Sequence, residues 1–494
     1  MKTSKLVLSS CLMMAGVSVQ AQEKPNVILI LCDDLGWGDT GFNGNEVIQT
    51  PNLDAWAGDG IKFNRFYSAS AVSSPTRVSC LTGRNPYRTG MFHAGDGILR
   101  EEEVTIPELL KEEGYTSGHF GKWHLGTLTY SEKDANHGNI GNEKEYNPPK
   151  NHGYDDAFVT ESKVPTWDPM KKPTGKVRNN GWNALAPDDP YVAFGTYYWD
   201  IDGNKVTDNL EGDDSRVIMD RVLPFIQKSK DSDTPFAAVI WFHTPHMPCV
   251  AGPEYAALYE GYNDDFKNFA GCVTAMDEQV GRLRAFLAEN GLEENTMVWF
   301  CSDNGPENCI QDGGGVTGGF RDRKRSLHEG GLRVPAFMAW PKVVKEPFET
   351  DAPAVTSDYL PTIVSALGID KKKCVNELDG VDLMPLVKGK KFTRKTPIVS
   401  CLVDQASYSD ENYKIYIKKN KLECYDILKD PYETTPLTTI PKLDKKLDII
   451  DTVLKSYQNS FMGGEYGTKS YDKFPQEWRP ACQPIWEEVV NVAE

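Results

Sequence analysis

The sequence predicts an α/β fold in which a large, mostly parallel β-sheet lies between helices, with a smaller C-terminal subdomain built on a short antiparallel sheet. Apolar runs of strand length alternate with helical patterns along most of the chain, as in proteins whose parallel strands are joined by helices. The run at residues 26–32 is apolar almost throughout, which is typical of a strand covered on both faces. Near the C terminus, β-rich runs at residues 413–418 and 422–425 flank a turn centred on Asn420, which indicates an antiparallel hairpin.

Length and charge limit the organisation and the partners. The chain has 494 residues, enough for a large core and more than one structural unit. We expect a leader at residues 1–21, a main domain at residues 24–385 and a C-terminal α+β subdomain at residues 386–494. The formal net charge of −17 argues against a nucleic-acid partner, because such proteins usually present a basic face.

The N-terminal residues have the pattern of a secretory signal. Lys2 and Lys5 precede an apolar run at residues 6–19, and Val-Gln-Ala at residues 19–21 suits cleavage. We therefore expect export to a periplasm. Lipoprotein processing at Cys11 is the minority alternative, because this cysteine precedes most of the apolar run. No other apolar stretch reaches membrane-spanning length, so we expect no transmembrane segment.

Four predicted strands deliver polar residues at their carboxyl ends. They are residues 26–32 followed by Asp-Asp, residues 115–120 followed by Gly-Lys-Trp-His, residues 235–242 followed by His-Thr-Pro-His, and residues 297–301 followed by Ser-Asp-Asn-Gly. In open α/β sheets, ligands bind outside this edge. We therefore expect these four segments to meet in one site.

Carboxylates at two of these strand ends predict a cation site. Asp33, Asp34 and Asp303 would bring three negative charges together beside buried strands, which is costly unless the charges are paired or bind a metal. Because the expected ligands are oxygens, the ion should be Ca²⁺ or Mg²⁺ and not Zn²⁺. The alternative for any single aspartate is a turn or a loop cap.

Two helices are expected from local signals. Pro75 suits the first position of a helix and Ser74 its N-cap, which places Ser73 beside the free N–H groups and the positive end of the helix dipole. An oxyanion or a sulfate would be stabilised there, although a capped helix start without chemistry remains the alternative. Apolar residues recur at helical spacing through residues 272–290 until Gly291, which indicates a core-packing helix.

Residues 73–84 resemble the signature of the type I sulfatases, in the alkaline-phosphatase-like superfamily. Ser-Ser-Pro-Thr-Arg is followed at the family's distance by Thr-Gly-Arg. Further family motifs follow in the family's order: Asp-Asp at residues 33–34, Gly-Lys-x-His-Leu-Gly at residues 121–126, Pro-His-x-Pro at residues 245–248, Asp-Asn at residues 303–304 and Glu-Gly-Gly-x-Arg-x-Pro at residues 329–335. The resemblance runs from about residue 24 to about residue 435. It departs where Thr-Thr-Pro at residues 434–436 replaces a frequent asparagine.

This resemblance implies a sulfatase with a formylglycine (3-oxoalanine) made from Ser73 by a formylglycine-generating enzyme. The hydrate of that aldehyde would be the nucleophile. One Ca²⁺ would be held by Asp33, Asp34, Ser73, Asp303 and Asn304. Arg77 would hold the hydrate, Lys122 and Lys324 would neutralise the sulfuryl group, His246 with Lys324 would protonate the leaving alcohol, and His124 would deprotonate the hydrate.

The expected substrate is a sulfated carbohydrate. Residues 128–214 read as long loops that carry the aromatic residues Trp167, Trp182, Tyr197, Tyr198 and Trp199. These rings either stack on sugars or pin the loops to the surface. Arg321, Arg323 and Arg325 either contact a polyanionic chain or form a solvated run. A phosphate or phosphonate ester hydrolase on the same scaffold and an inactive sulfated-glycan binding protein are the alternatives, and the sugar and its sulfated position stay open.

Overall fold

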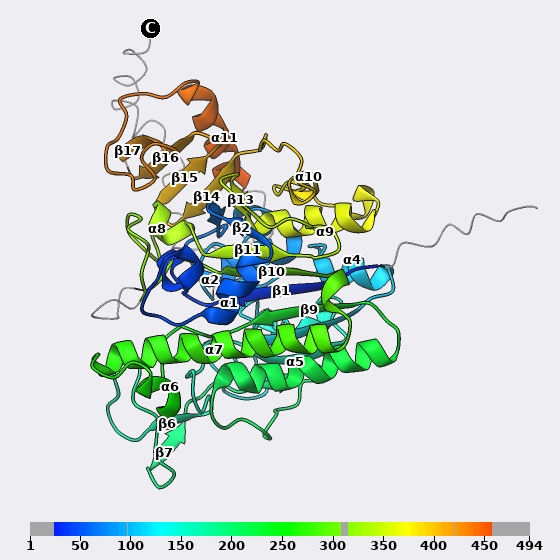
Figure 1. The fold of residues 1–494 in the computed structure, drawn as a ribbon, viewed down its shortest axis with the longest axis vertical. Helices are drawn as coiled ribbons and strands as arrows, with labels where there is room; N and C mark the ends of the chain where they lie inside the picture. The colour runs from blue at the N-terminus through cyan, green and yellow to red at the C-terminus, as the bar shows by residue number, and fades with distance from the viewer. Residues whose placement is uncertain (1–23, 96, 308–314, 420, 457–494) are drawn as a thin grey trace, which may run out of the picture.

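The computed structural model describes residues 24–95, 97–307, 315–419 and 421–456. The expected leader at residues 1–21, the turn residue Asn420 and the end of the expected C-terminal subdomain lie outside these residues. A nine-stranded sheet runs through the middle of the described structure, and a four-stranded sheet lies above it in Figure 1. The boundary between the two expected domains near residue 385 stays a prediction.

The central sheet is mixed and mostly parallel, as the sequence predicts. In order across the sheet, its strands are β12 (Phe348–Thr350), β2 (Ile61–Phe63), β11 (Ala336–Ala339), β10 (Thr296–Ser302), β1 (Asn26–Cys32), β9 (Phe236–Trp241), β4 (Thr116–Lys122), β5 (Asp156–Thr160) and β8 (Trp199–Asp200). The five strands from β10 to β5 run parallel to one another. Strand β11 is antiparallel to both of its neighbours, and β8 is antiparallel to β5.

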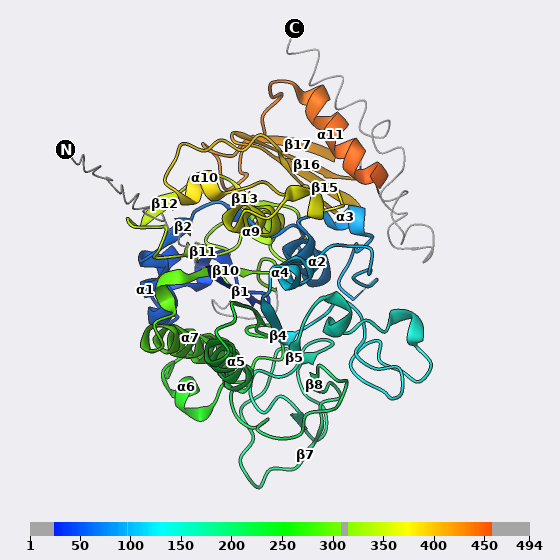
Figure 2. The same cartoon turned by 90° about the vertical axis from the view of Figure 1, so that its right-hand side faces the viewer.

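Helices cover both faces of this sheet (Figure 2). One face carries α1 (Pro51–Gly58), α5 (Asp214–Asp231) and α7 (Asp264–Glu289), and the other carries α2 (Ser73–Thr82), α4 (Ile106–Glu112) and α9 (Tyr359–Leu367). Neighbouring residues of a strand point to opposite faces. Ile28 therefore packs in the core on the α5 and α7 side, while Leu29 packs in the core on the α2 and α9 side. This arrangement explains the unbroken apolar run of β1.

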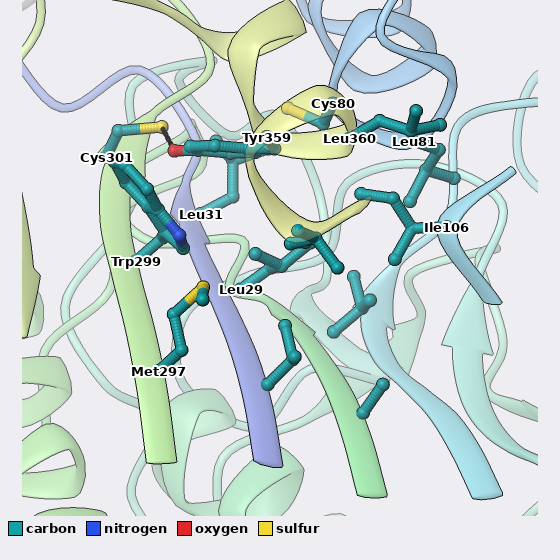
Figure 3. Packing of buried hydrophobic residues seen from close by; sticks show 14 of the residues in the cluster. Leu29, Leu31, Cys80, Leu81, Ile106, Met297, Trp299, Cys301, Tyr359 and Leu360 are labelled. Carbon is teal, nitrogen blue, oxygen red and sulfur yellow. Dashed lines mark hydrogen bonds between the residues drawn. The ribbon is translucent and has the colours of Figure 1, made fainter. Parts of the chain in front are cut away.

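The core beneath α2 and α9 is drawn in Figure 3. Trp299 of β10 and Leu31 of β1 lie under Tyr359, which projects from α9 across the carboxyl half of the sheet. The Tyr359 hydroxyl donates a hydrogen bond to Cys301 Sγ at 3.0 Å. This contact joins α9 to β10 two residues before Asp303.

The C-terminal sheet is antiparallel, as predicted, and the predicted hairpin at residues 413–418 and 422–425 forms its last two strands. Its strands are β14 (Ile398–Leu402), β15 (Gln405–Ser409), β16 (Tyr413–Lys418) and β17 (Lys421–Asp426), paired in chain order. Helix α11 (Leu443–Ser456) packs on one face through a cluster of buried residues that includes Leu447 and Ile450 (Figure 2).

The remaining elements are short. They are α3 (Pro86–Thr89), α6 (Pro253–Ala257), α8 (Glu329–Leu332), α10 (Met384–Val387), the strand pairs β3 (Phe66–Tyr67) with β13 (Ala354–Val355) and β6 (Lys171–Pro173) with β7 (Tyr191–Ala193), and the 3₁₀ helices Trp37–Asp39, Gly41–Asn43, Glu143–Glu145, Pro149–His152, Glu293–Asn295, Thr356–Asp358 and Lys371–Lys373. Among the described helices, none combines the length and the apolar character needed to cross a bilayer.

Three local predictions need correction. Helix α2 begins at Ser73, with Val72 as its N-cap, so the prediction that Ser74 caps it was wrong. Pro75 is tolerated at the third position because the first four N–H groups of a helix have no intrahelical acceptor. Helix α7 begins at Asp264, eight residues before the predicted stripe, where Asn263 accepts a hydrogen bond from the N–H of Phe266. The predicted loops of residues 128–214 contain β5 and β8, two strands of the central sheet, and the paired strands β6 and β7.

Candidate active site

The carboxyl ends of β1 and β10 bring the predicted metal-binding residues together. Because these strands are adjacent and parallel, Asp33 and Asp34 lie beside Asp303 and Asn304. The Asp34 N–H donates to Asp303 Oδ1 at 3.1 Å, and Asn304 Nδ2 donates to Asp34 Oδ1 at 2.7 Å. All four side chains are buried. The two strand ends therefore form one hydrogen-bonded unit.

Helix α2 presents Ser73 to this unit. Ser73 Oγ donates to Asp33 Oδ1 at 3.2 Å from the first position of the helix. Arg77 lies one turn later and is completely buried. Its Nη2 lies 2.7 Å from Asp303 Oδ2 and 3.5 Å from Asp33 Oδ2, and its guanidinium lies over the ring of Trp241 at 5.0 Å. Arg77 thus ties the helix start to both carboxylates.

Two lysines complete the charge balance. Lys122, the last residue of β4, places Nζ 2.7 Å from Asp33 Oδ2 and 3.5 Å from Ser73 Oγ. Lys324, from the segment between β10 and α8, places Nζ 2.6 Å from Asp34 Oδ1. Burial opposes ionisation of Asp33, but the positive charges of its neighbours, with Lys122 the strongest, together outweigh burial and keep the pKa of Asp33 well below its usual value. Burial, with the neighbouring Asp33 charge, raises the pKa of Asp303 to about 7.

His246 faces the cluster from the segment after β9. Its Nδ1 lies 2.7 Å from the Met247 carbonyl oxygen and its Nε2 lies 3.7 Å from Asp34 Oδ2. The hydrogen bond to a carbonyl requires a proton on Nδ1, which leaves the Nε2 lone pair directed at the site. The side chain is 15% exposed, so His246 is not sealed in the interior. Burial lowers the pKa of His246 to about 4.

His124 and His243 have different surroundings. His124 follows β4 with φ of 57°, and its N–H donates to the Glu161 carbonyl oxygen at 3.0 Å. Its Nδ1 has no hydrogen-bond partner among the described residues, and burial and the Lys122 charge hold its pKa well below the usual value. His243 instead lies fully buried between Asp214 and Thr160, with contacts of 2.8 and 2.7 Å. We therefore assign His243 a structural role.

The residues present fit a hard divalent cation. Ligand atoms of Asp33, Asp34 and His246 all lie within 4.8 Å of one another. Asn304 Oδ1 is buried and accepts no hydrogen bond within the described ranges. Carboxylate and amide oxygens are the donors that Ca²⁺ prefers. Asp303 is less free to act as a ligand, because Arg77 and the Asp34 N–H already contact its two oxygens; its role as a ligand stays a prediction.

Several aromatic and basic residues have structural partners. Tyr198 is fully buried, and Trp199 is 5% exposed with its Nε1 donating to Asp134 Oδ2 at 2.8 Å. For these two rings, burial favours the loop-pinning alternative over sugar stacking. Trp182 is half-buried and remains a candidate.

The three arginines beside Lys324 all have internal partners, although the side chain of Arg325 is also 56% exposed. Arg321 bonds to Glu423 and Tyr425, Arg323 to the carbonyl oxygens of residues 307 and 315, and Arg325 to the Glu307 carboxylate. Both sequence-based alternatives, contact with a polyanion and a solvated run, overlooked these internal partners.

Sequence reasoning missed Glu161. It lies at the end of β5, is 1% exposed, and accepts hydrogen bonds from the backbone N–H groups of residues 136–138 and from the Thr127 hydroxyl. Glu161 thus organises the loop beside His124. Its only local signal was the strand before it, and that strand was not predicted.

A sequence model of the sulfatase family matches residues 25–369. The chain belongs to the sulfatase family. Mouse (Mus musculus) N-acetylgalactosamine-6-sulfatase is 32% identical over 407 residues, which cover 79% of this chain and 71% of that protein. Rat (Rattus norvegicus) steryl-sulfatase is 31% identical over 416 residues, covering 74% and 70%. This sulfatase is thus a sulfuric ester hydrolase.

The fold is also shared with solved structures. The structure of Ps i-CgsB in complex with k-i-k-neocarrahexaose superposes with a TM-score of 0.71 over 94% of this chain and 99% of that one, at 23% identity. At this identity the likeness establishes the fold of the sulfatase, with its central sheet and small C-terminal sheet, and not its substrate.

Proposed function

We propose that this sulfatase hydrolyses sulfate monoesters of carbohydrates through a formylglycine made from Ser73, assisted by one Ca²⁺. The observation that carries the proposal is the position of Ser73. Its Oγ lies at a helix N-terminus, within 3.2 Å of Asp33 and 3.5 Å of Lys122 Nζ. A nucleophile at this point would meet a sulfate held by cationic side chains and by the N–H groups of the helix start.

Formylglycine and Ca²⁺ would each supply defined chemistry. As its hydrate, formylglycine would supply one hydroxyl as the nucleophile and a second hydroxyl whose deprotonation would expel sulfate and restore the aldehyde. A Ca²⁺ ion held by Asp33, Asp34 and Asn304, with Asp303 and residue 73, would supply positive charge for the sulfate oxygens and favour ionisation of a nearby hydroxyl. Ca²⁺ rather than Mg²⁺ is proposed from family membership.

The protein's own side chains would bind and orient the substrate. Arg77 is held by Asp303 and Asp33, and Asp33 accepts from Ser73 Oγ, so the guanidinium would hold the hydrate of residue 73 from one side. Lys122 and Lys324 would exchange part of their contact with Asp33 and Asp34 for the sulfuryl oxygens, whose charge they would stabilise in the transition state.

Proton transfer is assigned to the two histidines. Because Nδ1 of His246 is held by a carbonyl oxygen, Nε2 is the atom that would carry a proton to the leaving alcohol. The pKa of His246 is low in the free protein, and an anionic sulfate beside Nε2 would raise it by favouring the charged imidazolium. His124 has a partner-free Nδ1 among the described residues and would accept a proton from residue 73 when sulfate leaves.

A chromogenic assay tests the reaction class. We expect hydrolysis of an aryl sulfate and much slower hydrolysis of the matched aryl phosphate. Faster turnover of the phosphate would favour the phosphate or phosphonate esterase. No turnover of either, with retained binding of sulfated sugar, would favour a glycan-binding protein.

Mass spectrometry tests the nucleophile. Peptides that contain residue 73, from protein made in its native host, should show the loss of two hydrogens that accompanies oxidation of serine to formylglycine. Full activity with an unmodified serine would refute the modification and the need for a formylglycine-generating enzyme.

The substrate and the location belong to the same proposal. One relative is named for a sulfated sugar and one structural neighbour was solved with a neocarrahexaose, which supports a sulfated carbohydrate. The N-terminal pattern supports export to the periplasm. We expect defined sulfated mono- and disaccharides to be hydrolysed with higher kcat/KM than simple aryl sulfates, because remote sugar contacts stabilise the transition state.

A further inference from the structure

Lys324 lies on a loop, residues 321–328, whose backbone conformation depends on hydrogen bonds to other segments of the protein. Asp322 and Arg325 have φ angles of 58° and 72°, a left-handed conformation that costs energy for residues other than glycine. On the side of the central sheet, the Lys324 N–H donates to the Pro306 carbonyl oxygen at 3.1 Å and the Arg325 N–H to that of Ala71 at 2.9 Å. These contacts tie the Lys324 loop to the segments that carry Asn304 and Ser73.

Helix α8 provides the surface on which the loop turns. A Cβ on Gly330 would lie 2.1 Å from the Asp322 carbonyl oxygen, and one on Gly331 would lie 1.9 Å from that of Ser326. No side chain fits at these distances. The Gly-Gly pair of the Glu-Gly-Gly-x-Arg-x-Pro motif therefore allows the Lys324 loop to lie directly on α8.

The C-terminal sheet holds the loop from the opposite side. The side chain of Gln405, in β15, is buried. Its Nε2 donates to the Arg325 carbonyl oxygen at 2.9 Å, while its Oε1 accepts from the Leu327 N–H at 3.1 Å and from the Tyr416 hydroxyl at 2.9 Å. One amide thus binds two backbone groups just after Lys324 in the chain, the Arg325 carbonyl and the Leu327 N–H.

The same sheet also fixes α8. The Glu329 carboxylate contacts Lys414 Nζ at 2.8 Å and Arg333 Nη2 at 2.6 Å. Glu433, which follows β17, accepts from the Glu329 N–H at 2.7 Å and from His328 Nδ1 at 2.9 Å. These charged groups are buried between the two sheets, where α8 lies in Figure 1.

We propose that the C-terminal sheet is a positioning part of the active site, in which Gln405, with the ion pairs around Glu329, holds the Lys324 loop so that Nζ reaches the sulfuryl group. The proposal rests on the function proposed for Lys324. Gln405 is a positioning residue: it contacts the loop and not the substrate. Lys324 has a long, flexible side chain whose place depends on its backbone, and two of the backbone groups that follow it are bound by Gln405.

The test is Gln405→Met, which keeps the approximate size of the side chain and removes its hydrogen bonds to the Arg325 carbonyl oxygen, the Leu327 N–H and the Tyr416 hydroxyl. We expect kcat for an aryl sulfate to fall by about tenfold to a hundredfold, with a smaller change in KM, because a displacement of about 1 Å has effects of this size. The matched control is Tyr408→Phe, which removes hydrogen bonds of 3.2 Å to Asp410 and 3.4 Å to Lys446 on the opposite face of β15. We expect this control to keep the wild-type kcat.

A double-mutant cycle separates positioning from general damage. In a Lys324→Ala background, Gln405→Met should lower kcat by less than about twofold, because the group it positions is gone. The full single-mutant loss in that background would overturn the proposal, as would a wild-type kcat for Gln405→Met. Wild-type activity of Lys324→Ala would instead refute the proposed function of Lys324.

A milder variant guards against misfolding. Gln405→Glu keeps the shape of the side chain and the acceptor for Leu327, and replaces the donor to Arg325 by a carboxyl oxygen. If Gln405→Met does not fold, Gln405→Glu in the same cycle gives the answer: a kcat loss that disappears with Lys324→Ala supports positioning, and an equal loss in both backgrounds overturns it.

Discussion

The protein buries two ionic clusters, which differ in how fully their polar groups are paired within the protein. In the edge cluster, at the carboxyl ends of β1 and β10, burial raises the pKa of Asp303 to about 7, and Asn304 Oδ1 has no partner among the described residues. In the interface cluster, around Glu329 and between the two sheets, both oxygens of Glu329 have cationic or hydroxyl partners. There burial opposes ionisation, but Lys414 and Arg333 outweigh it and lower the pKa of Glu329 to about 2.

This difference separates a candidate active site from a cluster of ion pairs that stabilises the fold. A carboxylate whose partners are all supplied by the protein is stabilised in its charged form and holds elements together. A buried amide oxygen without a partner among the described residues, as at Asn304, is free to bind a group that comes from outside the protein. Changes to the edge cluster should therefore affect activity more than stability, and changes to the interface cluster should do the reverse.

The largest expected effect is on activity, in the edge cluster. Ser73→Ala should lower kcat/KM for an aryl sulfate by roughly 10³-fold or more, because the nucleophile is lost. The free energy of unfolding should change by about 1 kcal/mol or less, since one hydrogen bond to Asp33 is removed. Ser79→Ala is the control on the same helix, where Oγ bonds to the Thr76 carbonyl oxygen and the Thr356 hydroxyl and to no other described residue. Activity near wild type in Ser73→Ala would contradict the assignment.

The interface cluster gives the opposite expectation. Glu329→Gln should lower the free energy of unfolding by about 3 kcal/mol, because it leaves Arg333 buried with a neutral partner and Lys414 with only its 3.3 Å contact to Glu433 among these carboxylates. Urea denaturation measures this change, and Glu349→Gln, which breaks an exposed pair with Lys62, should cost less than about 1 kcal/mol. Because the pKa of Glu329 is lowered on folding, its contribution is present above the unfolded-state pKa and is lost as pH falls toward about 2. A loss as small as that of Glu349→Gln would show that the cluster is not stabilising.

The sequence predicted the edge cluster better than the interface cluster, for a physical reason. Each buried parallel strand is one apolar run, and its end is marked by the first polar residues, so β1 and β10 led directly to Asp33 and Asp303. The interface cluster depends on contacts between residues far apart in sequence, such as Gln405 with Arg325, and no local pattern encodes them. For the same reason the burial of Trp199 and the partners of Arg321 appear only in the structure.

Removal of the cation should have an intermediate effect, confined to the edge cluster. A chelator should abolish most activity. It should also lower the thermal midpoint, because an ion whose free concentration is about one hundred times its Kd stabilises the folded protein by about 2.7 kcal/mol. The Ca²⁺-dependent shift in the midpoint, measured by calorimetry, should persist in Glu329→Gln and shrink in Asp34→Asn. An equal shift in both variants, or none in the wild type, would place the ion elsewhere or remove it from the proposal.

The smallest expected effect concerns substrate contacts beside the edge cluster. Gly181 forms a parallel bridge with Cys249, and the Cys249 N–H donates to the Asn180 carbonyl oxygen at 2.8 Å, so the half-buried Trp182 is held next to the segment that carries His246. Trp182→Ala should lower kcat/KM for sugar sulfates by roughly fivefold, which corresponds to about 1 kcal/mol of aromatic contact. Aryl sulfates should be nearly unaffected. Tyr191→Ala, at a 55% exposed aromatic of β7, is the control and should change neither substrate, whereas an equal loss on both substrates in Trp182→Ala would show that Trp182, like Trp199, packs the loops and does not contact the sugar.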